Sequence, residues 1–418
     1  MGENFLNGRV VLRCGDCRQV MAGLVENSFD ACVTDPPYHL TSIVKRMSAP
    51  DAAPVSFGSD GRYQRVSRGF MGKMWDGGDV AFDPTTWCAV WRVLKPGAHL
   101  IAFGGTRTYA RMVVAIEDAG FEIRDTIAWL YGSGFPKSHN IGNGWGTALK
   151  PAMELMVLAR KPLSEGTVAA NVLKWGTGAI NVGGCRIATD ELTPRNNSGT
   201  ATLFGLGFEG KATTVVPSPL GRWPANVTHD GSAEVTAAFP DCDGAISNGS
   251  KIGEGYCGTD TFKIHAREQV PGYADTGSAA RFFYTSKADS DDRLGSRHPT
   301  VKPLDLMQWL VRLVTPPRGL VLDPFAGTGT TAEAAFREGM RCELIEAEAE
   351  YQADIRRRMA LALAGPDERV RESIKARNLP RDDGPLFASR ETWNDMWQRP
   401  FDWSKLEENH GSGNQNGS

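Results

Sequence analysis

The stretch Asp323-Pro324-Phe325-Ala326-Gly327-Thr328-Gly329-Thr330-Thr331 decides the fold of this 418-residue chain. It follows a short apolar run and opens a pattern typical of a helix, so its glycines mark a turn from a strand into a helix. Such a turn lets a ligand approach the free N–H groups at the helix N-terminus. No lysine follows the second glycine, which excludes a phosphate-binding loop. The spacing indicates a nucleoside cofactor site, with a purely structural turn as the alternative.

An acid ends the next apolar run along the chain. Glu346 directly follows the run 342–345, about 20 residues after Gly327. At this spacing an acid accepts hydrogen bonds from ribose hydroxyls. The glycine turn and Glu346 are therefore expected at the same edge of a parallel sheet.

Apolar runs that alternate with helical patterns continue on both sides of this segment. Further strands are predicted at 9–13, 29–34, 98–103, 123–130, 153–160 and 320–322, and helices at 303–314 and 330–338. The region 163–280 is rich in Gly, Ser, Thr and Asn and shows no long helical pattern. We predict four parts: 1–162, an inserted region 163–280, 281–364, and a charged tail 365–418 whose last residues are disordered. The tail carries Trp393, Trp397, Phe401 and Trp403 near helical spacing.

A second motif, Asp35-Pro36-Pro37-Tyr38, directly follows the predicted strand 29–34. An exocyclic amine on a base is a poor nucleophile because its lone pair is delocalised into the ring. Asp35 and the carbonyl oxygen of Pro36 can accept its two N–H bonds, and Pro37 helps to fix that carbonyl. Tyr38 offers a ring that stacks on the base. Taken alone the motif could be an ordinary loop turn; beside the glycine motif it is more specific.

Composition limits the class of protein. With 46 Lys and Arg against 49 Asp and Glu, the net charge is −3, which excludes a uniformly basic DNA-coating protein. The start of the chain is polar and no apolar run reaches membrane-spanning length, so we expect a cytoplasmic protein without membrane contact. The eight cysteines are scattered and are expected to be reduced thiols, and no metal site is predicted.

The two motifs in this order resemble the DNA amino-methyltransferases of the permuted beta group, which act on N6 of adenine or N4 of cytosine. Further pieces match: Gly15-Asp16-Cys17, Arg92 to Gly97, and His298-Pro-Thr-Val-Lys-Pro303. The resemblance covers roughly 9–160 and 281–358. It implies an α/β fold, a Rossmann-like mostly parallel methyltransferase sheet built from both ends of the chain, with an inserted target-recognition region.

The resemblance also implies roles for individual residues. Asp16 would accept from the adenine amine of S-adenosylmethionine, and Glu346 would hold its ribose. Asp16 could instead cap a helix, His298 could be a packed histidine, and Lys302 could be solvated. The catalytic residues would be Asp35, Pro36, Pro37 and Tyr38. The cofactor-binding residues would be Asp16, Asp323, Pro324, Phe325, Gly327, Gly329, Thr330, Glu346, Thr300 and Lys302, the last two helping to surround the methionine end.

Double-stranded DNA is the expected partner. The target nucleotide would be flipped into the site, and direct methyl displacement needs no nucleophilic cysteine and no metal. The loops 39–79 and 132–150 are candidates for phosphate contacts. Base reading is expected in the inserted region, where the candidates are Trp223, His229, Lys251, Lys263 and Arg267.

Several alternatives stay open. Cytosine N4 is activated in the same way, although family members with that specificity more often carry Ser at the first motif position. RNA or protein methylation usually goes with Asn-Pro-Pro-Tyr placed after the cofactor motif. A recognition subunit with an inactive methyltransferase fold is a third alternative, and a nicotinamide dehydrogenase makes no use of Asp35-Pro-Pro-Tyr38. Neither a homodimer nor a cognate restriction enzyme, both known in the family, is decided by the sequence.

Overall fold

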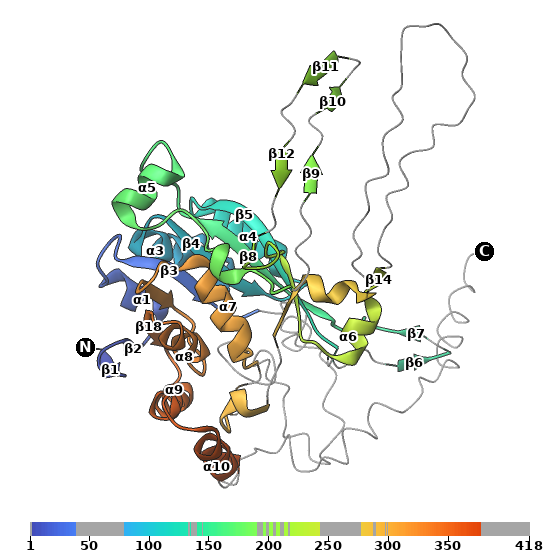
Figure 1. Ribbon diagram of the computed structural model, residues 1–418. Helices are drawn as coiled ribbons and strands as arrows, with labels where there is room; N and C mark the ends of the chain where they lie inside the picture. Colours follow the sequence, from blue (N-terminus) through green and yellow to red (C-terminus); the bar gives the residue numbers. More distant parts are fainter. Residues whose placement is uncertain are drawn as a thin grey trace, which may run out of the picture.

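One large sheet organises the chain (Figure 1). The computed structural model describes residues 2–38, 79–132, 134, 140–143, 145–189, 195–197, 200–203, 206–209, 213–215, 218–242, 277–286, 290–296, 298 and 300–377. Within these ranges the sheet has ten strands in the order β1-β2-β18-β17-β3-β4-β8-β5-β13-β16. Their bounds are β1 Glu3–Phe5, β2 Val10–Cys14, β3 Phe29–Thr34, β4 Leu94–Gly104, β5 Glu122–Leu130, β8 Met153–Arg160, β13 Val227–His229, β16 Tyr284–Thr285, β17 Leu320–Asp323 and β18 Arg341–Glu346.

The sheet is mostly parallel. The strands β2, β18, β17, β3 and β4 run parallel to one another, β8 runs antiparallel between β4 and β5, and β1 is antiparallel to β2. The remaining strands form separate two-stranded pairs: β6 Asn140–Gly142 with β7 Trp145–Gly146, β9 Arg195–Asn197 with β12 Thr213–Val215, β10 Thr200–Leu203 with β11 Leu206–Glu209, and β14 Asp241–Cys242 with β15 Gly277–Ser278.

Helices cover both faces of the sheet. Their bounds are α1 Cys17–Ala22, α3 Pro84–Val93, α4 Tyr109–Asp118, α5 Val168–Trp175, α6 Ala233–Ala238, α7 Leu304–Val314, α8 Thr330–Arg337, α9 Ala349–Leu361 and α10 Pro366–Arg377. Short 3-10 turns lie at Val80–Phe82, Gly183–Cys185, Ala279–Phe282 and Ser290–Arg293. Within the described part of the chain, no helix combines the length and apolar character needed to cross a membrane.

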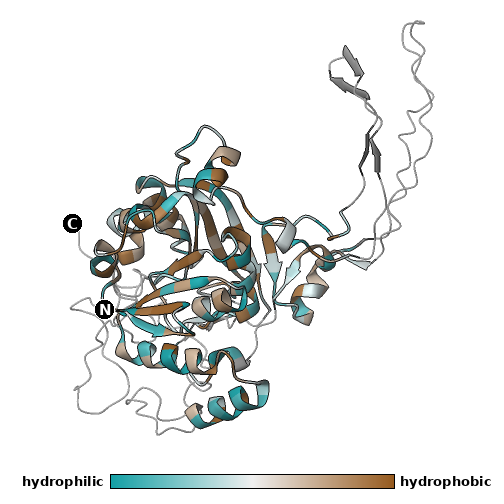
Figure 2. Cartoon of the chain, turned by 60° about the vertical axis from the view of Figure 1, so that its left-hand side comes forward, coloured by the Kyte–Doolittle hydropathy of each residue, from teal (hydrophilic) through white to brown (hydrophobic). Residues whose placement is uncertain are grey.

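Two apolar cores lie on opposite faces of the sheet because successive strand side chains alternate in direction. Ile101 and Phe103 of β4 belong to the core under α7, α8 and α9. Leu100 and Ala102 belong to the core under α1, α3 and α4. Figure 2 shows the apolar colours gathered on the strands and on the inner sides of the helices. A strand covered on both faces reads as a continuous apolar run, which is why 29–34 was recognisable.

Both ends of the chain build the centre of the sheet. The strands β17 and β18 come from the C-terminal part, and they lie between β2 and β3 from the N-terminal part (Figure 1). The chain leaves β17 toward β18 on one side and leaves β3 toward β4 on the other, so the strand order reverses between β17 and β3. Open α/β sheets bind ligands at the carboxyl ends of the strands at such a reversal. The predicted fold class is confirmed.

The region 163–280 contributes to the main sheet. Its strand β13 pairs with β5 in parallel, with Thr228 opposite Trp129. His229 is buried in this strand and contacts the carbonyl oxygen of Ala280, so its ring does not face solvent as a base reader would; Trp223 is exposed. The loop 39–78, the candidates Lys251, Lys263 and Arg267, and the tail from 378 lie outside the described residues.

Candidate active site

The glycine turn between β17 and α8 has the backbone that its sequence requires. Gly327 and Gly329 both have a left-handed φ, +51° and +77°, which glycine adopts without strain. A Cβ on Gly327 would lie 3.2 Å from Nε2 of His298. The backbone N–H of Gly327 donates to Oε2 of Glu346 at 2.7 Å. The turn is therefore tied to the end of β18 and leaves no side chain between its backbone and His298.

Asp323 and Thr34 join the two central strands at their carboxyl ends. The hydroxyl of Thr34 donates to Oδ1 of Asp323 at 2.6 Å, and the N–H of Phe325 donates to the same oxygen at 3.1 Å. Burial raises the pKa of Asp323 to about 6, although these donors lower it. Because Asp35 directly follows Thr34, this contact sets the amine motif beside the glycine turn.

The amine motif is held by the segment that precedes α7. Nζ of Lys302 donates to Oδ2 of Asp35 at 2.6 Å and to the hydroxyl of Tyr38 at 3.1 Å. Nζ of Lys302 also lies 3.3 Å from Oε2 of Glu154 on β8. The backbone of Tyr38 accepts from the hydroxyl of Thr108 at 2.8 Å, which fixes the end of the motif. Sequence reasoning placed Lys302 with the cofactor, whereas the structure places its ammonium on Asp35.

One pocket brings the two motifs together. The space that its lining residues enclose is about 350 Å³, which includes open solvent at the mouth. Asp35, Lys302 and Gly327 all line the pocket. The other lining residues are His298, Thr300, Met307, Asp323, Phe325, Ala326, Thr328, Thr330 and Thr331. The two ends of the chain therefore meet in a single site.

Glu346 and Asp16 lie beyond this lining, at the next strands. Oε1 of Glu346 accepts from the N–H of Glu348 at 2.8 Å, and Oε2 accepts from Gly327. Burial raises the pKa of Glu346 to about 7, although the two backbone N–H donors lower it. Asp16 follows β2, which pairs with β18, and its Oδ1 caps α1 by accepting from the N–H groups of Arg18 and Gln19. The helix cap, one of the two roles considered for Asp16, is thus present.

His298 is packed beside the turn. Its Nδ1 accepts from the N–H of Thr300 at 3.3 Å, and its ring meets Tyr351 edge to face at a centroid distance of 4.6 Å. Burial lowers the pKa of His298 to about 4. The imidazole is therefore neutral near pH 7, and it lies against Gly327 as part of the pocket wall.

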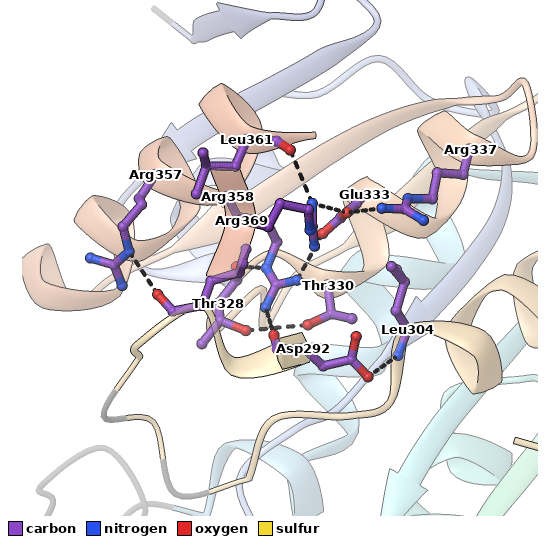
Figure 3. Close-up of polar contacts among 11 residues, drawn as sticks. Asp292, Leu304, Thr328, Thr330, Glu333, Arg337, Arg357, Arg358, Leu361 and Arg369 are labelled. Atoms are coloured by element: carbon purple, nitrogen blue, oxygen red, sulfur yellow. Dashed lines mark hydrogen bonds and ion pairs between the residues drawn. The ribbon is translucent and has the colours of Figure 1, made fainter. Parts of the chain in front are cut away.

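A buried ion network supports the glycine turn from below (Figure 3). Arg358 of α9 donates to the carbonyl oxygen of Thr328 at 2.8 Å and to Oε2 of Glu333 at 2.8 Å. Glu333 of α8 is fully buried and also pairs with Arg337 and Arg369, each at 2.8 Å. The network connects α8, α9 and α10 to the turn, so the pocket floor depends on the C-terminal helices.

Most predicted site residues gather at this edge of the sheet. Asp35, Asp323, Phe325, Gly327, Thr330, Thr300 and Lys302 line the pocket. Of the others, Pro36 and Pro324 are buried next to lining residues, and Gly329 is the N-cap residue that precedes α8. Sequence reasoning missed Thr34, Glu154 and Arg358, which hold Asp323, Lys302 and the turn. Thr34 and Glu154 are polar residues at the end and near the start of apolar runs, and Arg358 shares the inward face of its helix with Ile355.

Comparison with known proteins agrees with this geometry. The model of the DNA methylase family, N6_N4_Mtase, matches residues 29–357. Type II methyltransferase M.HindIII of Haemophilus influenzae is 26% identical over 268 residues, 60% of this chain and 59% of that protein. Type II methyltransferase M2.DpnII of Streptococcus pneumoniae is 38% identical over 68 residues, 16% of this chain and 25% of that protein. The chain thus spans less than two thirds of either relative.

Among solved structures, the cytosine-N4-specific PvuII DNA methyltransferase aligns with a TM-score of 0.44 and 14% identity, over 88% of this chain and 93% of that one. The fold and site define an α/β protein with a pocket at the strand reversal, lined by a glycine turn and by the aspartate of an Asp-Pro-Pro-Tyr motif. Because the family model covers most of the chain, the protein belongs to the DNA methylase family N6_N4_Mtase.

Proposed function

We propose that this protein transfers a methyl group from S-adenosylmethionine to N6 of adenine in double-stranded DNA. One observation carries the proposal: Asp35 and Gly327, from opposite ends of the chain, line the same pocket. Membership of the DNA methylase family supports DNA as the substrate. Among relatives of the permuted order, Asp at the first motif position favours adenine over cytosine.

The residues around the pocket fit S-adenosylmethionine, which when bound supplies a methyl group on a positively charged sulfonium. Glu346, at the end of β18, would accept from the ribose hydroxyls, with Asp16 near the adenine. Phe325 and Asp323 would lie along the methionine end. Gly327 lets the turn pass close to the imidazole of His298, since a Cβ there would lie 3.2 Å from Nε2.

Asp35 would activate the target amine. Its Oδ1 is buried and has no hydrogen-bond partner among the residues that the structure describes. Oδ1 and the carbonyl oxygen of Pro36 would accept the two N–H bonds of the amine and free its lone pair. Bound S-adenosylmethionine would supply the methyl group: the nitrogen would bond to the methyl carbon as the carbon–sulfur bond breaks with its electron pair on sulfur, and one proton of the amine would pass to water. Tyr38 would stack on the flipped base, offsetting part of the few kcal/mol that flipping costs.

Labelled methyl transfer tests this function. The protein is incubated with methyl-tritiated S-adenosylmethionine and unmethylated DNA, and the DNA is digested to nucleosides. We expect the label in N6-methyladenine. Label in N4-methylcytosine would contradict adenine as the target base. Label only in RNA or protein would contradict DNA as the substrate. DNA binding without any incorporation would indicate a recognition subunit.

Cofactor affinity is expected to depend on pH through Glu346. Burial raises its pKa to about 7, so Glu346 takes up a proton as the pH falls below neutrality. The ionised carboxylate is the stronger acceptor for ribose hydroxyls, and protonation therefore weakens binding. The dissociation constant of S-adenosylmethionine should rise about tenfold between pH 8 and pH 6, as measured by calorimetry.

The Glu346→Gln variant is the control for this pH dependence. It lacks the titrating group but keeps Asp323, whose pKa burial raises to about 6. We expect the variant to bind S-adenosylmethionine more weakly, with a dissociation constant that changes much less with pH. Any pH dependence that remains measures the titration of Asp323. A wild-type affinity that is constant from pH 8 to pH 6 would show that Glu346 does not contact the cofactor.

A further inference from the structure

Lys302 reaches across the carboxyl edge of the sheet. It is 5% exposed and lies in the segment before α7. Its Nζ contacts Asp35 after β3 and Glu154 in β8, two strands that β4 separates. The rings of Phe103 and Tyr38 lie beside the ammonium, with centroids 4.8 and 5.4 Å from Nζ. The lysine therefore links the amine motif to a strand that carries no predicted site residue.

The ammonium of Lys302 meets three groups. It donates to Oδ2 of Asp35 at 2.6 Å and to the Tyr38 hydroxyl at 3.1 Å, and it forms an ion pair with Oε2 of Glu154 at 3.3 Å. Burial lowers the pKa of Lys302, but the carboxylates of Asp35 and Glu154 more than compensate and raise it above its usual value. Lys302 is therefore a charged donor that two carboxylates and a hydroxyl hold in place.

The hydrogen bond from Lys302 to Oδ2 fixes the orientation of the Asp35 carboxylate. The carboxylate is planar, so holding Oδ2 sets the direction of Oδ1. Oδ1 is buried and lacks a partner within the described residues. Because the same ammonium holds the Tyr38 hydroxyl, the acceptor and the stacking ring keep a fixed relation to each other.

We infer that Lys302 and Glu154 are positioning residues for the target base. Lys302 holds Asp35 and Tyr38 in the geometry that receives the amine, and Glu154 holds Lys302 from the far side. The inference rests on the proposed function. It differs from the role that the family resemblance gives to Lys302, which is to help surround the methionine end of the cofactor. The two roles predict different effects on cofactor affinity.

Two variants separate positioning from charge. Lys302→Met removes the ammonium. The double variant Lys302→Met/Glu154→Gln removes one charge of each sign and keeps the wild-type net charge, which also guards against a fold loss caused by unpaired acids. We expect the single-turnover methyl-transfer rate to fall on the order of 100-fold in both, the cost of a displaced acceptor. The dissociation constant of S-adenosylmethionine should stay close to wild type.

Lys95→Met is the matched control. Lys95 pairs with Asp30 at 2.5 Å near the amino ends of β3 and β4, at the opposite edge of the sheet, and its loss should not change the transfer rate. Recovery of the rate in the double variant would mean that Lys302 acts through net charge. Weakened cofactor binding that accounts for the lost rate would place Lys302 with the cofactor.

Rate recovery in the double variant, weakened cofactor binding that accounts for the lost rate, or an unchanged rate in Lys302→Met would each overturn this inference. None of these results would overturn the proposed function. A wild-type protein that binds S-adenosylmethionine but never methylates DNA would instead overturn the proposed function, and the inference with it. The wild-type assay therefore distinguishes the two failures.

Discussion

Replacing Asp35 with Ala should lower the single-turnover rate of methyl transfer by about 1000-fold or more, while S-adenosylmethionine still binds. The variant loses Oδ1, the buried acceptor proposed to meet the target amine. In the wild-type protein the other carboxylate oxygen of Asp35, Oδ2, accepts from Lys302. No described contact of Asp35 involves Glu346, so the substitution should leave the ribose site in place. Transfer is measured with methyl-tritiated cofactor, and binding is measured by calorimetry.

Asp118→Ala is the control for this substitution. Asp118 is exposed at the end of α4, away from the pocket lining, and its variant should transfer methyl groups at the wild-type rate. In Asp35→Ala the ammonium of Lys302 keeps Glu154 and Tyr38, so the fold should survive. A rate within about tenfold of wild type would contradict the role of Asp35.

Glu333→Gln is expected to lower the free energy of unfolding by about 3–5 kcal/mol. Glu333 is 0% exposed and is the counter-charge of Arg358, which is 1% exposed. Without the carboxylate, the buried guanidinium of Arg358 keeps its charge but loses its counter-charge, and Arg369 of α10 loses its ion pair as well. Urea denaturation of the two proteins measures the difference.

The pH dependence of this loss has a defined sign. Burial raises the pKa of Glu333, but Arg358 and Arg369 outweigh it and hold the pKa below its usual value of 4.5. A depressed pKa means that the pair stabilises the fold above the unfolded value and that this contribution is lost as the pH falls through the folded pKa. The difference between wild type and Glu333→Gln should therefore shrink in acid.

Glu3→Gln is the exposed counterpart. Glu3 pairs with Arg356 at 2.9 Å on the surface, and a solvent-exposed pair of this kind contributes less than about 1 kcal/mol. Equal losses for Glu3→Gln and Glu333→Gln would show that burial does not set the strength of the network beneath the glycine turn.

The strands that carry the site could be predicted because each is a short apolar run bounded by turn residues. The runs 29–34 and 153–160 match β3 and β8, and 9–13 matches β2 within one residue. The strand β13 could not be predicted: it has only three residues, and its pairing with β5 bridges about 100 residues of chain. The local sequence pattern of a three-residue strand does not indicate which distant strand it pairs with.

The chemical partners within the site were harder to predict than the strands. Glu154 stands out as an acid in an apolar run, yet only the three-dimensional structure pairs it with Lys302. The resemblance assigns Lys302 to the cofactor, whereas its ammonium contacts the carboxylates of Asp35 and Glu154 and the hydroxyl of Tyr38. Arg358 follows Tyr351 and Ile355 at helical spacing, so the sequence marks it as inward-facing, but its contact with Thr328 depends on how α9 packs.

A crystal structure of the protein with bound S-adenosylmethionine tests the account most directly. We predict the ribose at Glu346, the methionine end along Phe325 and Gly327, and the sulfonium methyl directed toward Asp35. A base amine held by Oδ1 should then lie about 3–3.5 Å from the methyl carbon, the distance of a near-attack geometry. A cofactor bound away from the glycine turn, or one whose methyl group faces away from Asp35, would contradict the claim that the two ends of the chain form one methyl-transfer site.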